Sequence, residues 1–231
     1  MYESTLAGAF FYLWGAHDYQ QRRVGRNAIV LNAQNPLDNL LGDLVGKTDS
    51  GRWFIAELKR LESGFPQELI AKPHRANFLN WLASSTIDSQ VSSRAHFAVW
   101  AHNNDFRVSE YAATADPALF APTPTNLMRA VAIGFRDFYD EVNIRTRSKH
   151  PVCSQILSHG LGVPGPAMVN YIMNLIRHHK DSIDAQEESL LIFANIPPSG
   201  PAKFFCGSSF NGLWLELEHM RNLSAKNRPA P

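Results

Sequence analysis

The chain has only two cysteines and no large excess of charge of either sign. Cys153 and Cys206 are too few for a disulfide framework and lack the C-x-x-C spacing of a zinc knuckle. Its 22 lysines and arginines nearly balance 21 aspartates and glutamates, for a formal net charge of +1. No global positive field indicates a nucleic-acid partner, so such binding needs a local patch. We expect a protein of the reducing cytoplasm.

Long apolar runs are also missing. The apolar stretch LAGAFFYLWGA is too short to span a bilayer, and no basic segment of the signal-peptide type precedes it. Its helical spacing indicates a core helix, and no membrane partner is expected. With 231 residues, of which 45% are hydrophobic, the chain can bury a substantial core.

The order of predicted elements indicates an α/β protein with a mixed sheet flanked by helices. We expect a helix over 5–21, a strand at AIVL, two strands joined at DSG, a helix from near Pro73, and strands in RAHFAVWAH and FRVSEYAA. The segment SGFPQELIAK, which leads to the helix near Pro73, is expected to be a loop. The later part predicts helices near 126–142 and 167–180, strands in LLIFANI and AKFFCGSS, and a flexible tail over 223–231.

The stretch GDLVGKTDSGRWFIAELKR places charges inside an otherwise apolar hairpin. Its turn puts Gly51 at the position where the left-handed conformation favours glycine. If Thr48 pairs with Arg52, antiparallel counting places Asp43 opposite Glu57, with Cβ atoms about 4.5–5.5 Å apart. The two carboxylates are then expected to face each other.

Two opposed carboxylates in a partly buried hairpin repel each other and lose hydration, so they need a compensating cation. Mg²⁺ suits this role, because it binds one or two carboxylates and keeps water and phosphate in its other positions. Lys59 lies on the same strand face as Glu57, where an ammonium can orient water or stabilise charge on a phosphate oxygen. The pattern indicates metal-assisted phosphodiester hydrolysis. The alternative is an ordinary cross-strand ion pair at a solvated sheet edge.

These residues resemble the motif of the PD-(D/E)xK nuclease superfamily. In that family an aspartate on one strand precedes Glu/Asp-x-Lys on the next strand, inside an α-β-β-α-β core. Here Asp43 matches the first acid and Glu57-Leu58-Lys59 the tripeptide, while Gly42 stands where proline often occurs. The resemblance implies that Asp43, Glu57 and the Leu58 carbonyl hold Mg²⁺, with Mn²⁺ as a substitute, and that Lys59 assists the attacking water.

The resemblance extends over about residues 4–102. It implies a restriction-endonuclease-like core over about 4–113 with a C-terminal α/β extension over about 114–222, together forming one nuclease-like domain over 1–222. Members of the family often add an acid from the first helix, for which Glu3 and Asp18 both stay candidates. They also often add a polar residue from the helix after the tripeptide, and three residues stay open for that role: Gln67, Lys72 and His74.

We therefore expect a Mg²⁺-dependent endo- or exodeoxyribonuclease, acting alone, as a homodimer or with a partner protein. Phosphate contacts are first expected at basic residues near the hairpin, although a solvated surface is the usual role of such clusters: Arg22, Arg23, Arg26, Lys72 and Arg75. The alternative function is a catalytically inactive nuclease-fold module that binds nucleic acid or a protein. An intact Asp43, Glu57 and Lys59 triad argues against that alternative.

Overall fold

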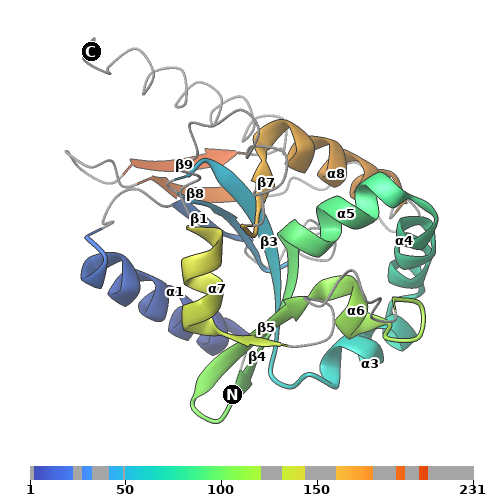
Figure 1. Ribbon diagram of the computed structural model, residues 1–231, viewed down its shortest axis with the longest axis horizontal. Coiled ribbons are helices and arrows are strands. Elements are labelled where there is room, and N and C mark those ends of the chain that lie inside the picture. Colours follow the sequence, from blue (N-terminus) through green and yellow to red (C-terminus); the bar gives the residue numbers. More distant parts are fainter. Residues whose placement is uncertain are drawn as a thin grey trace, which may run out of the picture.

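The computed structural model is an α/β arrangement in which one mixed sheet lies between two groups of helices (Figure 1). This architecture agrees with the fold class that the sequence predicts. The structure describes the following residues: 3–22, 28–32, 42–48, 50–120, 132–143, 160–178, 191–195 and 203–207. The predicted tail over 223–231 lies outside them, and the proposed division into core and extension stays a prediction.

The described strands form a nine-stranded sheet in the order β6-β5-β4-β3-β2-β1-β8-β9, with β7 pairing to β3. Among these strands, β3 and β4 pair in parallel and the other pairs are antiparallel. The bounds are as follows: β1 Ala28–Asn32, β2 Leu44–Lys47, β3 Arg52–Lys59, β4 His96–His102, β5 Asp105–Glu110, β6 Ile133–Gly134, β7 Val163–Pro164, β8 Leu191–Asn195 and β9 Lys203–Gly207.

Helices cover both faces of the sheet (Figure 1). Helices α1 (Glu3–Gln20) and α7 (Phe135–Val142) pack on one face, which we call the α1 face. The other face, which we call the α4 face, carries the remaining described helices: α3 Gly64–Ala71, α4 Pro73–Ser84, α5 Thr86–Ala95, α6 Tyr111–Ala115 and α8 Gly165–His178. Three of these, α3, α4 and α5, form the crossover that joins the parallel strands β3 and β4.

Strand β3 is buried on both faces because helices cover the sheet on both sides. Phe54, Ala56 and Leu58 belong to the core on the α1 face, whereas Trp53 and Ile55 belong to the core on the α4 face. This two-residue alternation is the one expected of a strand, and it directs the odd-numbered positions of β3 toward α3 and α4. A strand covered on both sides reads as a continuous apolar run, which makes a charged residue within it conspicuous.

The strands at AIVL, in the hairpin and in RAHFAVWAH are confirmed, as are the helix from Pro73 and those near 5–21 and 167–180. The expected loop at SGFPQELIAK is wrong, because α3 begins at Gly64. Phe65 is buried there against Trp100 and Tyr111, and Pro66 falls in the first turn, where proline costs no helical hydrogen bond.

The helix expected near 126–142 is only partly confirmed. Residues 132–142 of this range are described, and within them the pair Ile133–Gly134 forms β6 before the helix begins at Phe135. This pair adds to the sheet because Ile133 pairs with Val108. Helix α5, over Thr86–Ala95, has no counterpart among the predicted elements. Its sequence is polar, and Ser85 caps it by accepting a hydrogen bond from the Asp88 backbone N–H.

Replacing Gly46 by alanine is expected to destabilise the protein by about 1–3 kcal/mol. Gly46 faces Phe54 across the hairpin, and a Cβ atom on Gly46 would overlap the Phe54 ring. The ring cannot easily yield, because it is fully buried and stacks on Trp14 at 5.5 Å. Urea unfolding of Gly46→Ala measures the effect.

The matched control is Gly8→Ala, in the exposed part of α1. A Cβ atom on Gly8 would meet nothing within 4 Å, so this substitution is expected to raise stability by about 0.5–1 kcal/mol through helix propensity. Equal stability of Gly46→Ala and the wild type would show that the hairpin can open enough to admit a methyl group.

Candidate active site

The β2–β3 hairpin has the register that its turn predicts. Gly51 has a φ of +78°, and the pairing runs from Lys47 opposite Trp53 down to Leu44 opposite Ala56. One residue beyond Leu44, Asp43 therefore comes beside Glu57. The predicted juxtaposition of the two acids on neighbouring chain segments follows directly from this register.

Asp43 is tied to the backbone of β3. Its Oδ2 atom accepts a hydrogen bond from the Leu58 N–H at 2.5 Å. The preceding Gly42 has a φ of +81°, and a Cβ atom there would lie 3.1 Å from the Ala56 carbonyl oxygen and 3.2 Å from Glu57 Oε2. Proline, whose ring holds φ near −65°, does not fit this conformation, which explains the glycine at this position of the motif.

Glu57 is a buried carboxylate at the centre of the sheet, with 2% of its surface exposed. Its Oε1 atom accepts a hydrogen bond from Lys59 Nζ at 2.6 Å and lies 3.4 Å from Arg75 Nη1. Its Oε2 atom is buried with no hydrogen-bond partner. The ion pair that the alternative predicts is present between Lys59 and Glu57, but it lies in an interior strand with Glu57 buried and not at a solvated sheet edge.

The charges around Glu57 decide its protonation state. Burial raises the pKa of the Glu57 carboxyl, but the nearby charges of Arg75, Lys59 and Lys72 together outweigh burial and lower it overall. Burial likewise opposes the charge on Lys59, yet the Glu57 carboxylate, with Asp43 and Glu68, raises the pKa of Lys59 well above its usual range. These neighbouring carboxylates therefore favour the charged ammonium form of Lys59, which donates hydrogen bonds.

A third carboxylate, Glu68 on α3, joins the two hairpin acids. It pairs with Lys72 at 2.7 Å, with Arg75 at 3.0 Å and with Lys59 at 3.6 Å. Sequence reasoning missed Glu68 because its segment was interpreted as a loop, in which helical spacing has no meaning. The available signal was the four-residue spacing of Glu68 and Lys72, which is typical of a helical ion pair.

Arg75 is the most deeply buried cation near the hairpin, at 4% exposed. Besides the two carboxylates, its Nη1 atom donates a hydrogen bond to the Tyr111 hydroxyl at 3.0 Å. The Tyr111 ring in turn stacks on His96 at 4.3 Å, and His96 Nδ1 lies 2.8 Å from the Tyr171 hydroxyl. A buried polar chain of Tyr111, His96 and Tyr171 therefore continues from Arg75.

Six charged residues from the hairpin and from the α3–α4 segment lie together, and we call them the carboxylate–cation cluster. It holds three carboxylates and three cations, so its formal charges balance: Asp43, Glu57 and Glu68 with Lys59, Lys72 and Arg75. Beside it lies a small pocket with an empty volume of about 200 Å³, part of which is open to solvent. Glu57 and Arg75 line this pocket with five other residues: Gly42, Phe78, His96, Tyr111 and Leu175.

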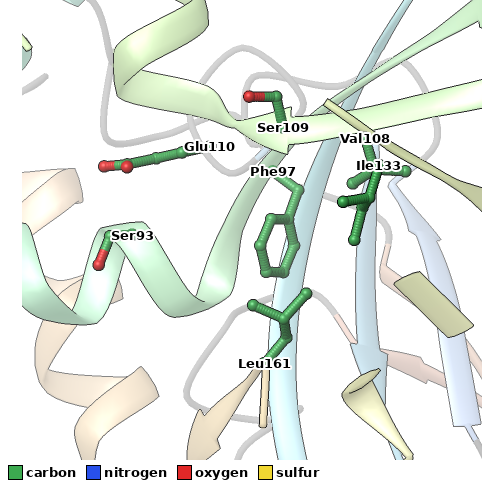
Figure 2. A pocket seen from close by; sticks show the side chains of 7 residues that line it. All are labelled: Ser93, Phe97, Val108, Ser109, Glu110, Ile133 and Leu161. Atoms are coloured by element: carbon green, nitrogen blue, oxygen red, sulfur yellow. The ribbon is translucent and has the colours of Figure 1, made fainter. Parts of the chain in front are cut away.

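A second small pocket lies near the ends of β4 and β5 and carries another buried acid. Figure 2 shows the side chains of Glu110 and Ser93 on one side of it, while the Phe97 ring points toward Leu161. Glu110 is 4% exposed, and no second acid lines this pocket. A lone carboxyl group among mostly apolar side chains makes a poorer metal site than the hairpin acids do.

The other predicted site residues are not all brought to the cluster. Lys72 and Arg75 belong to it, and Arg75 is turned inward toward carboxylates. Arg22 is exposed at the end of α1, whereas Arg23 and Arg26 lie outside the described residues. Asp18 accepts a hydrogen bond from the Tyr139 hydroxyl at 2.5 Å, and so lies on the α1 face, away from Glu57.

The remaining candidates add little to the site. Gln67 is exposed on α3, and the side chains of Glu3 and His74 are outside the part of the chain whose side chains are described. In the described part of the chain, no three His, Cys, Asp or Glu side chains are grouped to hold a metal ion. The assignment of Asp43 and Glu57 as metal ligands therefore stays a prediction.

Comparisons with known proteins give no relative. No family model, no curated protein and no solved structure matches the chain. Among the described helices, none has the length and apolar character needed to cross a membrane. The chemistry of the carboxylate–cation cluster is therefore the basis for any functional assignment.

The Glu57→Gln variant is expected to lose part of the acid sensitivity of the fold. Because the folded-state pKa of Glu57 lies below its ordinary value of 4.5, the ionised group stabilises the protein above pH 4.5. That stabilisation disappears as the pH falls from 4.5 through the lowered pKa, since the unfolded chain takes up the proton first. Urea unfolding in this pH range measures the free energy of unfolding. This free energy should fall less steeply with decreasing pH in Glu57→Gln than in the wild type.

The control is Glu62→Gln, because Glu62 is an exposed glutamate just after β3. Its free energy of unfolding should depend on pH as that of the wild type does. Identical slopes for Glu57→Gln and the wild type would mean that Glu57 does not carry its charge in the folded protein.

Proposed function

We propose that this protein is a Mg²⁺-dependent nuclease that hydrolyses phosphodiester bonds in DNA, built on a restriction-endonuclease-like core. The observation that carries the proposal is the hairpin itself. Asp43 precedes β2 directly, so that the β2–β3 register extended by one residue brings it beside Glu57. Lys59 Nζ lies 2.6 Å from Glu57, and Glu57 Oε2 is a buried oxygen without a hydrogen-bond partner. The order α1, β1, β2, β3, crossover helices and β4 also supports such a core, with β1 as one strand more than the α-β-β-α-β pattern contains.

The donor set fits a hard divalent cation. Glu57 Oε2 and the Asp43 carboxylate are oxygen ligands, and the Leu58 carbonyl stays the proposed third protein donor. Mg²⁺ commonly binds through one or two carboxylates and completes its shell with water and substrate phosphate, so a group of three acidic side chains is not required. When bound, Mg²⁺ would polarise the phosphate and make water a stronger nucleophile at neutral pH.

Within this proposal, each residue of the hairpin has its own task. Asp43 and Glu57 bind the cation, and the bond from the Leu58 N–H fixes the orientation of Asp43. Lys59 donates hydrogen bonds to the attacking water or to a phosphate oxygen, stabilising the negative charge that grows there in the transition state. In this scheme Lys59 acts as a hydrogen-bond donor, and the proton of the attacking water passes to solvent or to a phosphate oxygen.

DNA would approach the solvent-accessible side of the cluster. Lys72 has a side chain that is 32% exposed and Lys59 one that is 12% exposed, so both can reach a phosphate. Arg22 is an exposed cation at the end of α1. Because the overall charge is close to zero, a second copy of the chain or another protein is proposed to complete the contact surface.

A binding module without turnover is the second candidate. The observation that favours it is the balance of charge in the cluster, because carboxylates that are already neutralised by Lys59 and Arg75 attract a divalent ion less strongly. The two candidates differ in one property. Only the nuclease should cleave DNA, and its cleavage should require Mg²⁺ or Mn²⁺.

Incubation with supercoiled plasmid and with linear duplex in Mg²⁺, Mn²⁺ or EDTA tests the proposal. We expect cleavage with either metal and none in EDTA. Glu57→Gln and Lys59→Met should each lower the rate by at least about 100-fold, as the loss of a ligand or of a transition-state donor does elsewhere. Gel electrophoresis of the products measures the rate.

The exposed Glu62→Gln variant is the control and should cleave like the wild type. Cleavage that survives in Glu57→Gln and Lys59→Met would assign the activity to a contaminant or to another site. A DNA mobility shift without cleavage in either metal would support the binding module instead.

A further inference from the structure

We propose that Arg75 is the built-in counter-cation of Glu57 and thereby sets how tightly the site binds a divalent ion. The inference rests on the proposed function, because it takes Asp43 and Glu57 as the ligands. Arg75 itself touches neither the cation nor the substrate. It is a positioning residue that acts through the Glu57 carboxylate.

Contacts with residues of three elements fix the position of the Arg75 guanidinium. Its Nη1 atom lies 3.4 Å from Glu57 Oε1 on β3 and 3.0 Å from Glu68 Oε2 on α3, and it donates a hydrogen bond to the Tyr111 hydroxyl on α6 at 3.0 Å. With 5% of its side chain exposed, Arg75 lacks the free rotation of a surface arginine. Its positive charge therefore stays beside Glu57 whether or not another cation arrives.

This fixed charge has two effects on Glu57. Arg75 and Lys59 both approach Oε1, so that Oε2 is left as the oxygen without a hydrogen bond, on the side where Gly42 leads into Asp43. The same guanidinium repels a divalent ion that approaches Oε2, and the repulsion is strong because little water separates the charges. Arg75 thus orients the ligand and at the same time weakens its hold on the ion.

Glu68 modulates this effect. It shares Arg75 and Lys59 with Glu57, and it also pairs with Lys72. Without the Glu68 charge, Arg75 and Lys59 would act on Glu57 alone, and the excess of positive charge would oppose a divalent ion more strongly. Removing the charge of Arg75 and removing that of Glu68 should therefore change the metal affinity in opposite directions.

Isothermal titration of the full chain with Mn²⁺ tests this inference without measuring activity. We expect Arg75→Gln to bind Mn²⁺ about tenfold more tightly than the wild type and Glu68→Gln about tenfold more weakly, the size of effect that about 1.4 kcal/mol of electrostatic energy produces. Arg107→Gln on β5, a half-buried arginine outside the cluster, is the matched control and should stay within about twofold of the wild type. Circular dichroism confirms that each variant is folded.

The opposite signs separate this role from a merely structural one. Weaker binding in both Arg75→Gln and Glu68→Gln would show that both residues only support the fold, and it would overturn the inference. If Arg75→Gln does not fold, Glu68→Gln decides, because unchanged or tighter binding in that variant also overturns it. An unchanged Mn²⁺ affinity in folded Arg75→Gln would also overturn the inference.

The outcome for the proposed function can be read separately. Mn²⁺ binding by the wild type that is lost in Asp43→Asn supports the metal site, whatever the Arg75 variant does. If neither the wild type nor Arg75→Gln binds Mn²⁺, the metal site and the counter-cation role both fail. If only Arg75→Gln binds, the inference is supported and the wild-type site is shown to be suppressed by its own arginine.

Discussion

The burial of the Glu57 carboxylate in an interior strand is the constraint on which the rest of the site depends. A carboxylate taken out of water loses several kcal/mol of hydration unless cations and hydrogen bonds replace it. Lys59 comes from the same strand, and Arg75 comes from a helix of the crossover. The fold therefore surrounds one acid with groups that keep it ionised.

The hairpin explains how an acid reaches such a place. Alternation along β3 directs Phe54, Ala56 and Leu58 into one core and Trp53, Ile55 and Glu57 toward the other, so a shift of one residue would exchange the two sets. The tight turn at Gly51 prevents that shift, and Gly42 and Gly46 leave room for groups on β3. The glycines of the hairpin thus fix the positions of the charged residues as well as the packing of the core.

The local part of the site could be predicted from sequence, and the distant part could not. The register, the face shared by Glu57 and Lys59, and the approach of Asp43 all follow from a three-residue turn and a period of two. The inward turn of Arg75 and the participation of Glu68 depend on how α3 and α4 pack on the sheet, which no short-range pattern specifies. Phe65 illustrates the cause: its burial against Trp100 and Tyr111 stabilises a helix in the segment that the sequence analysis expects to be a loop.

The parallel pairing of β3 with β4 has a consequence for the assembly of the molecule. Parallel neighbours cannot be joined by a tight turn, so the chain must complete three helices before β4 can dock beside β3. Ordering such a long connection is slow compared with closing a hairpin. During synthesis, the two hairpin acids would therefore meet first in water, and the protein would gain its desolvated charges only when the crossover closes over them.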